Sequence, residues 1–258
     1  MHNVSLEGQM PEWYEDQDGY YGRNYFEAYA GHPAEGSTEA AIEFLATLLK
    51  RGDVILDVPC GYGRHALRLA ELGFSVTGQD LNSFFIEKAR ETAKVAGVSI
   101  EYRQGDMREL PFSNRFDVAL NIFTSFGYFL AERDNLAFLT AVRGALKSGG
   151  RFVLDFVNRE KIIRGWKPHH SSVYQNGIRV EGSRTFDMVT GIEHSIAVHI
   201  HPDGSRKTVV SSQRLYTLPE LIDLCQRAGL KPIETYGNFD GSPVSLESGR
   251  VILVAQKC

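Results

Sequence analysis

Between residues 54 and 157 the sequence alternates strand-like runs with stretches of helical length, and this alternation limits the fold more than any other feature. The strand-like runs cover residues 54–58, 74–78, 99–103, 116–122 and 151–156. The helical patterns cover residues 38–50, 65–72, 82–96 and 132–146. Asn82 and Gly97 are of the types that begin and end a helix. Strands joined by such helices form βαβ units, so the sequence predicts a mainly parallel sheet with helices on both faces.

The pattern changes after Asn158. Residues 173–216 hold Val-, Thr- and Ile-rich runs separated by turn sequences such as Pro202-Asp203-Gly204, which predicts three or four antiparallel strands and no helix. A helix is then expected from Thr217 to Ala228, with Glu220 at capping-box spacing. Two further strands are predicted at residues 230–236 and 251–256.

We therefore expect a Rossmann-like α/β fold, with a mainly parallel seven-stranded sheet, helices on both faces and an antiparallel β insertion. The expected units are an aromatic N-terminal segment at 1–37, a core at 38–157 and 217–258, and an insertion at 158–216.

Composition excludes several other classes. The chain has 258 residues, of which 43% are hydrophobic and 23% charged, as in globular proteins with a buried core. It has no apolar stretch of membrane-spanning length and no signal-peptide pattern at its start, so we expect a cytoplasmic protein without a membrane partner.

Cys60, Cys225 and Cys258 are too widely spaced for a disulfide framework or a structural zinc site. Lys and Arg form no dense cluster, so no nucleic-acid partner is expected, whereas a homodimer is left open.

The segment from Val54 to Ala66 passes from a strand through a glycine-containing turn into a helix. Gly61 and Gly63 let the backbone approach a ligand closely, and the carboxyl ends of parallel strands are where such sheets bind cofactors. The same residues satisfy G-x-G-x-x-A, and Asp80 lies 19 residues beyond Gly61. A NAD-dependent oxidoreductase is therefore one interpretation.

Three acidic residues favour a cationic ligand instead. Asp57 precedes Gly61 by four residues, where it would face a pyrophosphate at close range. Asp80 ends the next strand, and Asp106 follows the third. Carboxylates at three neighbouring strand ends suit a positively charged nucleoside–amino acid better than a dinucleotide. We expect the three to converge beside the glycines.

Five segments, in order, resemble the motifs of class I S-adenosylmethionine-dependent methyltransferases. They are Asp57–Gly63, Val76–Leu81, Gly105–Arg108, Phe116–Phe123 and Leu146–Phe152. The resemblance is strong over residues 40–158 and moderate over 214–257. Residues 123–128 and the late insertion are also similar to small-molecule N-methyltransferases of aminosugar pathways. Pro59 departs from the pattern, because it replaces the usual first glycine of the first motif.

The resemblance implies S-adenosylmethionine as cofactor, S-adenosylhomocysteine as product, and a set of contacts. The implied cofactor contacts are Asp57, Pro59, Gly61 and Gly63 for the methionine part, Asp80, Leu81, Asp106 and Met107 for the ribose and adenine, and Asn121 and Phe123 beside the methyl group. Tyr128 is the candidate for orienting a nucleophile or relaying its proton, with Asn121 as a second catalytic candidate. Tyr14, Tyr21 and Tyr25 would belong to a lid over the donor.

We predict methyl transfer to a small-molecule acceptor with a nitrogen or oxygen nucleophile, by in-line attack. The first 40 residues hold eight acidic residues and one basic residue, Arg23, which favours an amine or cationic acceptor. The alternatives are a NAD-dependent oxidoreductase, a macromolecule methyltransferase and a non-catalytic protein that retains donor binding. His199 and His201 share one face of a predicted strand, but we interpret them as surface residues and expect no metal. The acceptor, any general base, the oligomeric state and the role of the insertion are left open.

Overall fold

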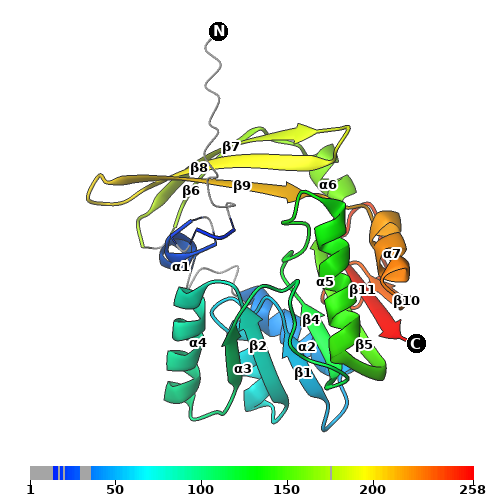
Figure 1. The fold of residues 1–258 in the computed structure, drawn as a ribbon. Coiled ribbons are helices and arrows are strands. Elements are labelled where there is room, and N and C mark those ends of the chain that lie inside the picture. Colours follow the sequence, from blue (N-terminus) through cyan, green and yellow to red (C-terminus); the bar gives the residue numbers. More distant parts are fainter. Residues whose placement is uncertain (1–13, 17, 20, 30–35, 175) are drawn as a thin grey trace.

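The computed structural model describes residues 14–258 except 17, 20, 30–35 and 175, and its centre is a seven-stranded sheet (Figure 1). The strands are β1 (Val54–Asp57), β2 (Ser75–Asp80), β3 (Glu101–Gln104), β4 (Phe116–Asn121), β5 (Leu146–Val157), β10 (Leu230–Tyr236) and β11 (Arg250–Lys257). Their order across the sheet is β10-β11-β5-β4-β1-β2-β3. Strands β1 to β5 are parallel, whereas β11 is antiparallel to both β5 and β10. The predicted mainly parallel, seven-stranded sheet is confirmed.

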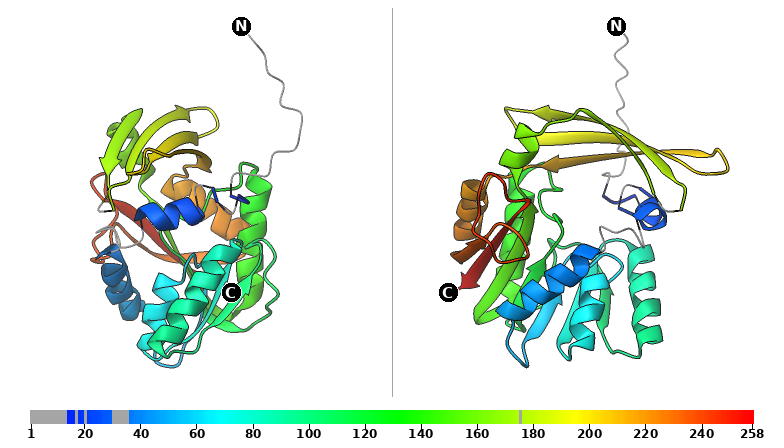
Figure 2. Two further views of the ribbon diagram at one scale, coloured as in Figure 1. Left: turned by 90° about the vertical axis from the view of Figure 1, so that its left-hand side faces the viewer. Right: turned by 180° about the vertical axis from the view of Figure 1, so that it is seen from behind.

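Helices cover both faces of this sheet, as the alternation of the sequence predicted (Figures 1 and 2). Helices α2 (Gly36–Leu48), α3 (Arg64–Glu71) and α4 (Ser83–Ala96) pack on one face, and α5 (Glu132–Ala145) and α7 (Leu218–Arg227) on the other. Successive strand residues point to opposite faces. In β1, Ile55 therefore joins the core beneath α2–α4 and Leu56 the core beneath α5 and α7.

The expected helix ends are formed by the expected residues. The Asn82 side chain accepts hydrogen bonds from the first turn of α4, and Gly97 ends that helix with a positive φ of 70°. Thr217 and Glu220 form a complete capping box at the start of α7. The short helix α6 (Arg159–Arg164), capped by Asn158, was not predicted, because six residues are too few to show a helical period.

A second, four-stranded antiparallel sheet lies over the carboxyl ends of β1–β5 (Figures 1 and 2). Its strands, in sheet order, are β6 (His169–Val173), β7 (Arg179–Asp187), β8 (Ile192–Ile200) and β9 (Arg206–Arg214). Helix α1 (Arg23–Tyr29) lies between the two sheets in Figure 1. The antiparallel insertion is thus confirmed as part of the fold.

The structure corrects the interpretation of His199 as a surface residue, because this side chain is only 1% exposed. His199 lies two residues from Ala197 and so shares its face of β8, which packs on the small core of Val180 and Val209. Within the described ranges, no three His, Cys, Asp or Glu side chains gather as metal ligands would.

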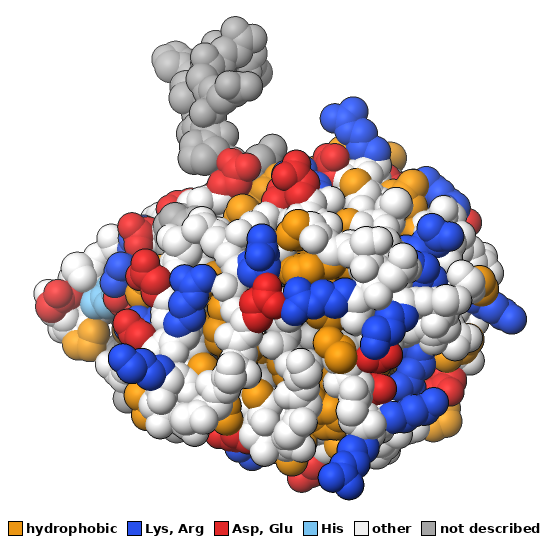
Figure 3. Space-filling model, turned by 60° about the horizontal axis from the view of Figure 1, so that its bottom comes forward, with side chains coloured by type: hydrophobic (Ala, Val, Ile, Leu, Met, Phe, Trp, Pro, Cys, Tyr) orange, Lys and Arg blue, Asp and Glu red, His pale blue; other side chains and the backbone are white. Residues whose placement is uncertain are grey.

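The surface in Figure 3 intersperses acidic and basic side chains, with apolar ones scattered between them. None of the helices in the described part of the chain combines the length and apolar character needed to cross a bilayer.

Candidate active site

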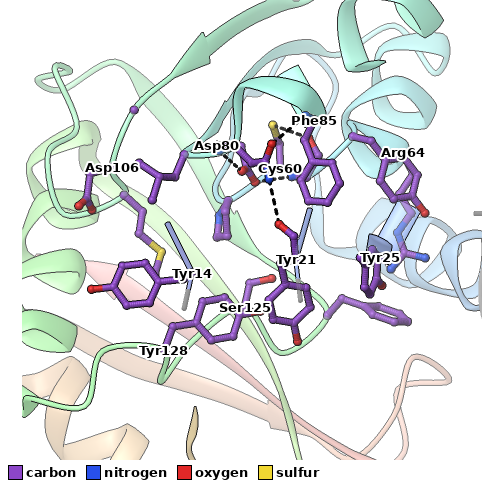
Figure 4. A pocket seen from close by; sticks show the side chains of 18 of the residues that line it. Tyr14, Tyr21, Tyr25, Cys60, Arg64, Asp80, Phe85, Asp106, Ser125 and Tyr128 are labelled. Atoms are coloured by element: carbon purple, nitrogen blue, oxygen red, sulfur yellow. Dashed lines mark hydrogen bonds between the residues drawn. The ribbon is translucent and has the colours of Figure 1, made fainter. Parts of the chain in front are cut away.

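A cavity opens at the carboxyl ends of the parallel strands, where the sequence placed the ligand site (Figure 4). It has about 950 Å³ of empty space, part of which is open to solvent. Its walls come from the loop after β1, the end of β2, the loop after β3, the turn after β4, the first residues of α3 and α4, and the N-terminal segment. The described lining residues are Tyr14, Tyr21, Tyr25, Pro59, Cys60, Gly61, Tyr62, Arg64, Asp80, Leu81, Asn82, Phe85, Gly105, Asp106, Met107, Phe123, Ser125, Tyr128 and Phe129.

The two glycines after β1 have different roles. Gly61 lines the cavity with φ 55°, and a Cβ added there would meet nothing within 4 Å, so its backbone is open to a ligand. Gly63, with φ 80°, is not among the described lining residues. A Cβ at Gly63 would lie 2.5 Å from the Tyr102 hydroxyl oxygen and 2.9 Å from the Ala89 Cβ. Gly63 therefore permits close packing of the loop against Tyr102 and Ala89.

Two other residues of this loop lie on the cavity wall. Pro59 lines the cavity and follows a cis peptide bond from Val58. Cys60 also lines it, but burial raises the pKa of its thiol well above the ordinary value. The thiol therefore stays protonated at neutral pH and is a poor nucleophile, which fits its interpretation as a small residue in a tight turn.

Asp80 ends β2 and is held by two backbone groups. Its Oδ2 accepts a hydrogen bond from the Gly61 N–H at 2.7 Å, and its Oδ1 accepts one from the Asn82 N–H at 2.8 Å. Burial raises the pKa of Asp80 to about 6, although these two N–H groups act in the opposite direction. Asp80 is thus fixed at the cavity wall, where it is ionised at neutral pH.

Asp106 lines the same cavity from the loop after β3. Its carboxylate pairs with the Arg108 guanidinium, with an Nε–Oδ2 distance of 2.9 Å, and it accepts the Arg108 N–H at 2.8 Å. The Asp106 carbonyl accepts a hydrogen bond from the Gln79 side chain at 2.9 Å, which ties this loop to β2. Leu81 and Met107 add an apolar wall next to the two acids.

Asp57 lies behind this wall and is not among the described residues that line the cavity. Its side chain is 1% exposed, and Oδ2 has no hydrogen-bond partner among the described residues. Burial, reinforced by the charge of Asp80, raises the pKa of Asp57 to about 7. The structure thus brings Asp80 and Asp106 to one cavity, whereas Asp57 is buried and is not among the described residues that line it.

Asn121 and Phe123 were both predicted to lie beside the methyl group, but only Phe123 is among the described residues that line the cavity. Asn121 is fully buried, and its amide donates to the carbonyls of Val58 at 2.9 Å and Ser125 at 3.2 Å. It therefore joins the ends of β1 and β4, whereas the ring of Phe123 forms part of the cavity wall.

An aromatic wall faces the acidic side of the cavity (Figure 4). The rings of Tyr21 and Tyr128 are 5.2 Å apart, those of Tyr21 and Tyr25 are 5.4 Å apart, and Tyr14 packs edge-on against Phe129 at 5.3 Å. The Tyr21 carbonyl accepts a hydrogen bond from the Asn82 side chain at 3.0 Å, which ties the N-terminal segment to the start of α4. All three tyrosines predicted for the lid therefore lie at the cavity.

Tyr128 is 9% exposed, and burial raises the pKa of its phenol above the ordinary value. Hydrogen bonds with Tyr21 and Ser125 oppose this shift only in part. The phenol therefore stays protonated at neutral pH and can donate a hydrogen bond. It cannot accept a proton there as a base would.

Arg64 was missed by sequence reasoning. It lines the cavity across from Asp106 (Figure 4). Its Nη1 donates to the Thr38 hydroxyl at 3.0 Å, and its guanidinium carbon lies 4.0 Å from the centroid of the Phe123 ring. Within the described ranges, no carboxylate forms an ion pair with it. One signal was present in the sequence, because Arg64 is the first residue of α3, where a cation opposes the helix dipole.

Phe123 and Thr124, which follow β4, have left-handed backbones with φ 69° and 63°. For residues with a side chain such conformations cost on the order of 1–3 kcal/mol each, and they persist only where surrounding contacts enforce them. Ser125, the next residue, lines the cavity and was not predicted to do so. The turn after β4 is therefore a strained part of the wall.

Rossmann-like sheet order, a glycine turn after β1 and acids after β2 and β3 together define the class I methyltransferase architecture. Comparison with known proteins agrees, because residues 55–150 match the family model described as "Methyltransferase domain". The chain carries this domain and is an S-adenosylmethionine-dependent methyltransferase.

The chain is similar to enzymes with different acceptors. It is 28% identical over 221 residues to a glycine/sarcosine N-methyltransferase of Halorhodospira halochloris, covering 83% of this chain and 79% of that protein. It is 31% identical over 196 residues to a ubiquinone biosynthesis O-methyltransferase of Cereibacter sphaeroides, covering 74% and 66%. Among solved structures, the CcbJ methyltransferase from Streptomyces caelestis matches with a TM-score of 0.78 and 21% identity over 89% of this chain and 92% of that chain.

Proposed function

We propose that this protein transfers a methyl group from S-adenosylmethionine to a small molecule that presents a nitrogen or oxygen nucleophile. The observation that carries the proposal is the two-sided cavity, with a glycine loop and two fixed carboxylates on one side and an aromatic wall on the other. Both curated relatives named above are methyltransferases named for small molecules, one an N-methyltransferase and one an O-methyltransferase.

The described residues fit the cofactor part by part. Asp80, held by two N–H groups, would accept hydrogen bonds from the ribose hydroxyls. Asp106 and Met107 would border the adenine, and the open backbone at Gly61 would leave room for the methionine part. Arg64 would bind the methionine carboxylate, because it is a cavity cation that no described acid neutralises.

When bound, S-adenosylmethionine supplies a methyl group that its sulfonium has already activated. The chain's own residues then need to align the acceptor with that group and exclude water. Tyr128 and Ser125 would orient the acceptor as hydrogen-bonding partners, and Tyr14, Tyr21 and Tyr25 would cover the site as a lid. Since the Tyr128 phenol stays protonated, an amine acceptor would lose its proton to water or bind already neutral.

A contact between the antiparallel sheet and the cavity wall favours the interpretation that the acceptor enters from the side of the insertion. The Gln213 side chain donates to the carbonyls of Thr124 at 2.9 Å and Phe126 at 2.7 Å, on both sides of the cavity residue Ser125. We therefore assign the insertion 158–216 to the acceptor side and residues 38–157 and 217–258 to the catalytic core. Of the segment 1–37, Tyr14, Tyr21 and Tyr25 carry the lid assignment, whereas residues 1–13, 17, 20 and 30–35 lie outside the described residues.

The proposal is tested in two stages. Calorimetry with S-adenosylhomocysteine should show one site per chain. Mass spectrometry should then detect a gain of one methyl group on members of a panel of small amines, amino acids and phenols incubated with S-adenosylmethionine. Unstructured peptides and RNA serve as comparison substrates, and exclusive methylation of either would overturn the small-molecule assignment.

A further inference from the structure

The turn after β4 is held by hydrogen bonds from its backbone to β5. The buried carboxylate of Asp155 on β5 accepts the Phe123 N–H at 2.7 Å, and the Asp155 carbonyl accepts the Thr124 N–H at 3.0 Å. Both N–H groups belong to the residues with left-handed backbones. The end of β5 thus sets the path of the strained turn.

Arg250, the first residue of β11, completes this arrangement. Its Nε and Nη2 atoms donate to the two oxygens of Asp155, each at 2.6 Å, and Nη2 also donates to the Thr124 hydroxyl at 2.9 Å. Asp155 is 0% exposed, so Arg250 supplies the positive charge that lets a carboxylate persist there. A bidentate pair of this kind also fixes orientation, because the guanidinium and the carboxylate are both planar.

The same turn carries the ring that supports Arg64. The Arg64 guanidinium carbon lies 4.0 Å from the centroid of the Phe123 ring, and that of Arg250 lies 5.3 Å from it. The Phe123 ring therefore contacts two guanidiniums, that of Arg64 in the cavity wall and that of Arg250, which is not among the described lining residues. Both cations are attracted to the ring. Displacing Phe123 would remove the surface on which Arg64 rests.

We propose that Asp155 and Arg250 are positioning residues that hold the Phe123–Thr124 turn and, through the Phe123 ring, orient Arg64 toward the carboxylate of the bound cofactor. Neither is among the described residues that line the cavity, so each acts through Phe123. The role of Arg64 in this inference rests on the proposed function. A carboxylate on the acceptor is the other group that Arg64 would bind by the same charge-assisted hydrogen bonds.

The experiment uses two probes that differ only at the amino-acid end. S-adenosylhomocysteine carries the carboxylate, and 5′-methylthioadenosine lacks the whole amino-acid part. Calorimetry gives their affinities for the wild type, Arg64→Gln, Arg250→Met, Arg250→Lys and the double variant Arg64→Gln/Arg250→Met. Lys147→Met is the matched control, because it breaks the Lys147–Asp117 ion pair at the opposite ends of the strands.

Arg64→Gln should weaken S-adenosylhomocysteine binding by about tenfold or more and methylthioadenosine binding by less than about twofold. Arg250→Met should cause a loss of about five- to tenfold with the same selectivity, and Arg250→Lys should restore part of it. The double variant should bind S-adenosylhomocysteine no more weakly than Arg64→Gln alone, because Arg250 acts through Arg64. The control should leave both affinities unchanged.

Three results would overturn the positioning role. They are unchanged binding in folded Arg250→Met, equal loss of both probes, and losses that multiply in the double variant. If Arg250→Met does not fold, Thr124→Val is used instead, because it removes one of the contacts made by Arg250. This variant should weaken S-adenosylhomocysteine binding by about threefold and leave methylthioadenosine binding unchanged. The absence of such a selective loss would also overturn the positioning role. If Arg64→Gln leaves both probes unaffected but raises the acceptor KM, the carboxylate belongs to the acceptor and the assigned orientation fails. Failure of the wild type to bind S-adenosylhomocysteine would instead end the proposed function.

Discussion

The Asp80 carboxylate and the Gly61 backbone N–H are joined by a 2.7 Å hydrogen bond, so the end of β2 and the loop after β1 share one acceptor. The Asn82 N–H holds the other oxygen at 2.8 Å. A carboxylate has about four lone-pair sites, so lone-pair capacity remains for a ligand hydroxyl. The carboxylate is therefore in place before any ligand arrives, and binding need not order it.

Asp80→Asn should weaken S-adenosylhomocysteine binding by roughly 10- to 100-fold, because hydrogen bonds to a charged group contribute about 1.5–3 kcal/mol. Calorimetry at pH 8 measures the change. Glu109→Gln, at an exposed position in the loop after β3, is the control and should bind as the wild type does. An affinity within twofold of the wild type would rule Asp80 out as a ribose ligand.

The affinity of the wild type should also depend on pH through Asp80. Its pKa is raised to about 6, and only the ionised form has both oxygens free to accept. Affinity should therefore be constant above pH 7 and fall by up to about tenfold per pH unit below 6. The fall should be absent in Asp80→Asn. If it persists in that variant, another group is responsible.

Asp57 should reduce stability at neutral and alkaline pH. Its pKa in the folded protein is about 7 against an ordinary value of 3.8, so the folded state binds the extra proton between these values. The free energy of unfolding should therefore decrease as pH rises from about 4 to about 7 and then level off, as far as this group is concerned. Asp57→Asn should raise stability at pH 8 by roughly 1–3 kcal/mol and have little effect at pH 4.

Urea unfolding of the ligand-free protein at both pH values measures this difference. Asp80, whose pKa is also raised, contributes with the same sign, so the pH dependence should shrink in Asp57→Asn without vanishing. A variant less stable than the wild type at pH 8 would show that the Asp57 charge has a stabilising partner.

Tyr128→Phe should lower the turnover of whichever acceptor the panel identifies by roughly tenfold, because one oriented hydrogen bond is lost. The affinity for S-adenosylhomocysteine should stay within twofold. Since burial keeps the phenol protonated, the pH–rate profile should keep its shape in the variant. A basic limb that disappears with Tyr128 would show instead that the phenol titrates during the reaction.

Thr217→Ala should destabilise the protein by about 1 kcal/mol, because it removes the capping box of α7. Urea unfolding checks this value. Thr92→Ala makes the same change at an exposed position within α4, where alanine is the better helix former, and should be neutral or stabilising. Equal effects of the two substitutions would mean that the cap does not contribute.

Local pattern was enough to predict the sheet, the helix caps and the positions of Asp80 and Asp106, because each depends on neighbouring residues and on where a strand ends. Asp57 also ends a strand, yet its side chain is buried and is not among the described residues that line the cavity. The difference depends on the path of the loop, which the hydrophobic period does not encode. His199 was misread because burial on β8 depends on packing of one sheet face, not on polarity.

The contacts of Arg250 could not have been found from the sequence. Its partners Asp155 and Thr124 are 95 and 126 residues away, on other strands and turns, and their pairing depends on the strand order of the finished sheet. Arg64 stands beside the glycine turn, but its place in the cavity depends on the ring of Phe123. Side-chain direction at such positions follows from tertiary structure.

Gly127 joins the turn after β4 to the last residue of β9. Its carbonyl accepts the Arg214 N–H at 2.8 Å, and a Cβ added at Gly127 would lie 2.4 Å from the Arg214 carbonyl oxygen. The last residue of β9 therefore fits only against a turn that has glycine at this place. A chimera that exchanges the antiparallel sheet with that of a relative would have to carry the 123–127 turn with it, so the two would be inherited as a single module.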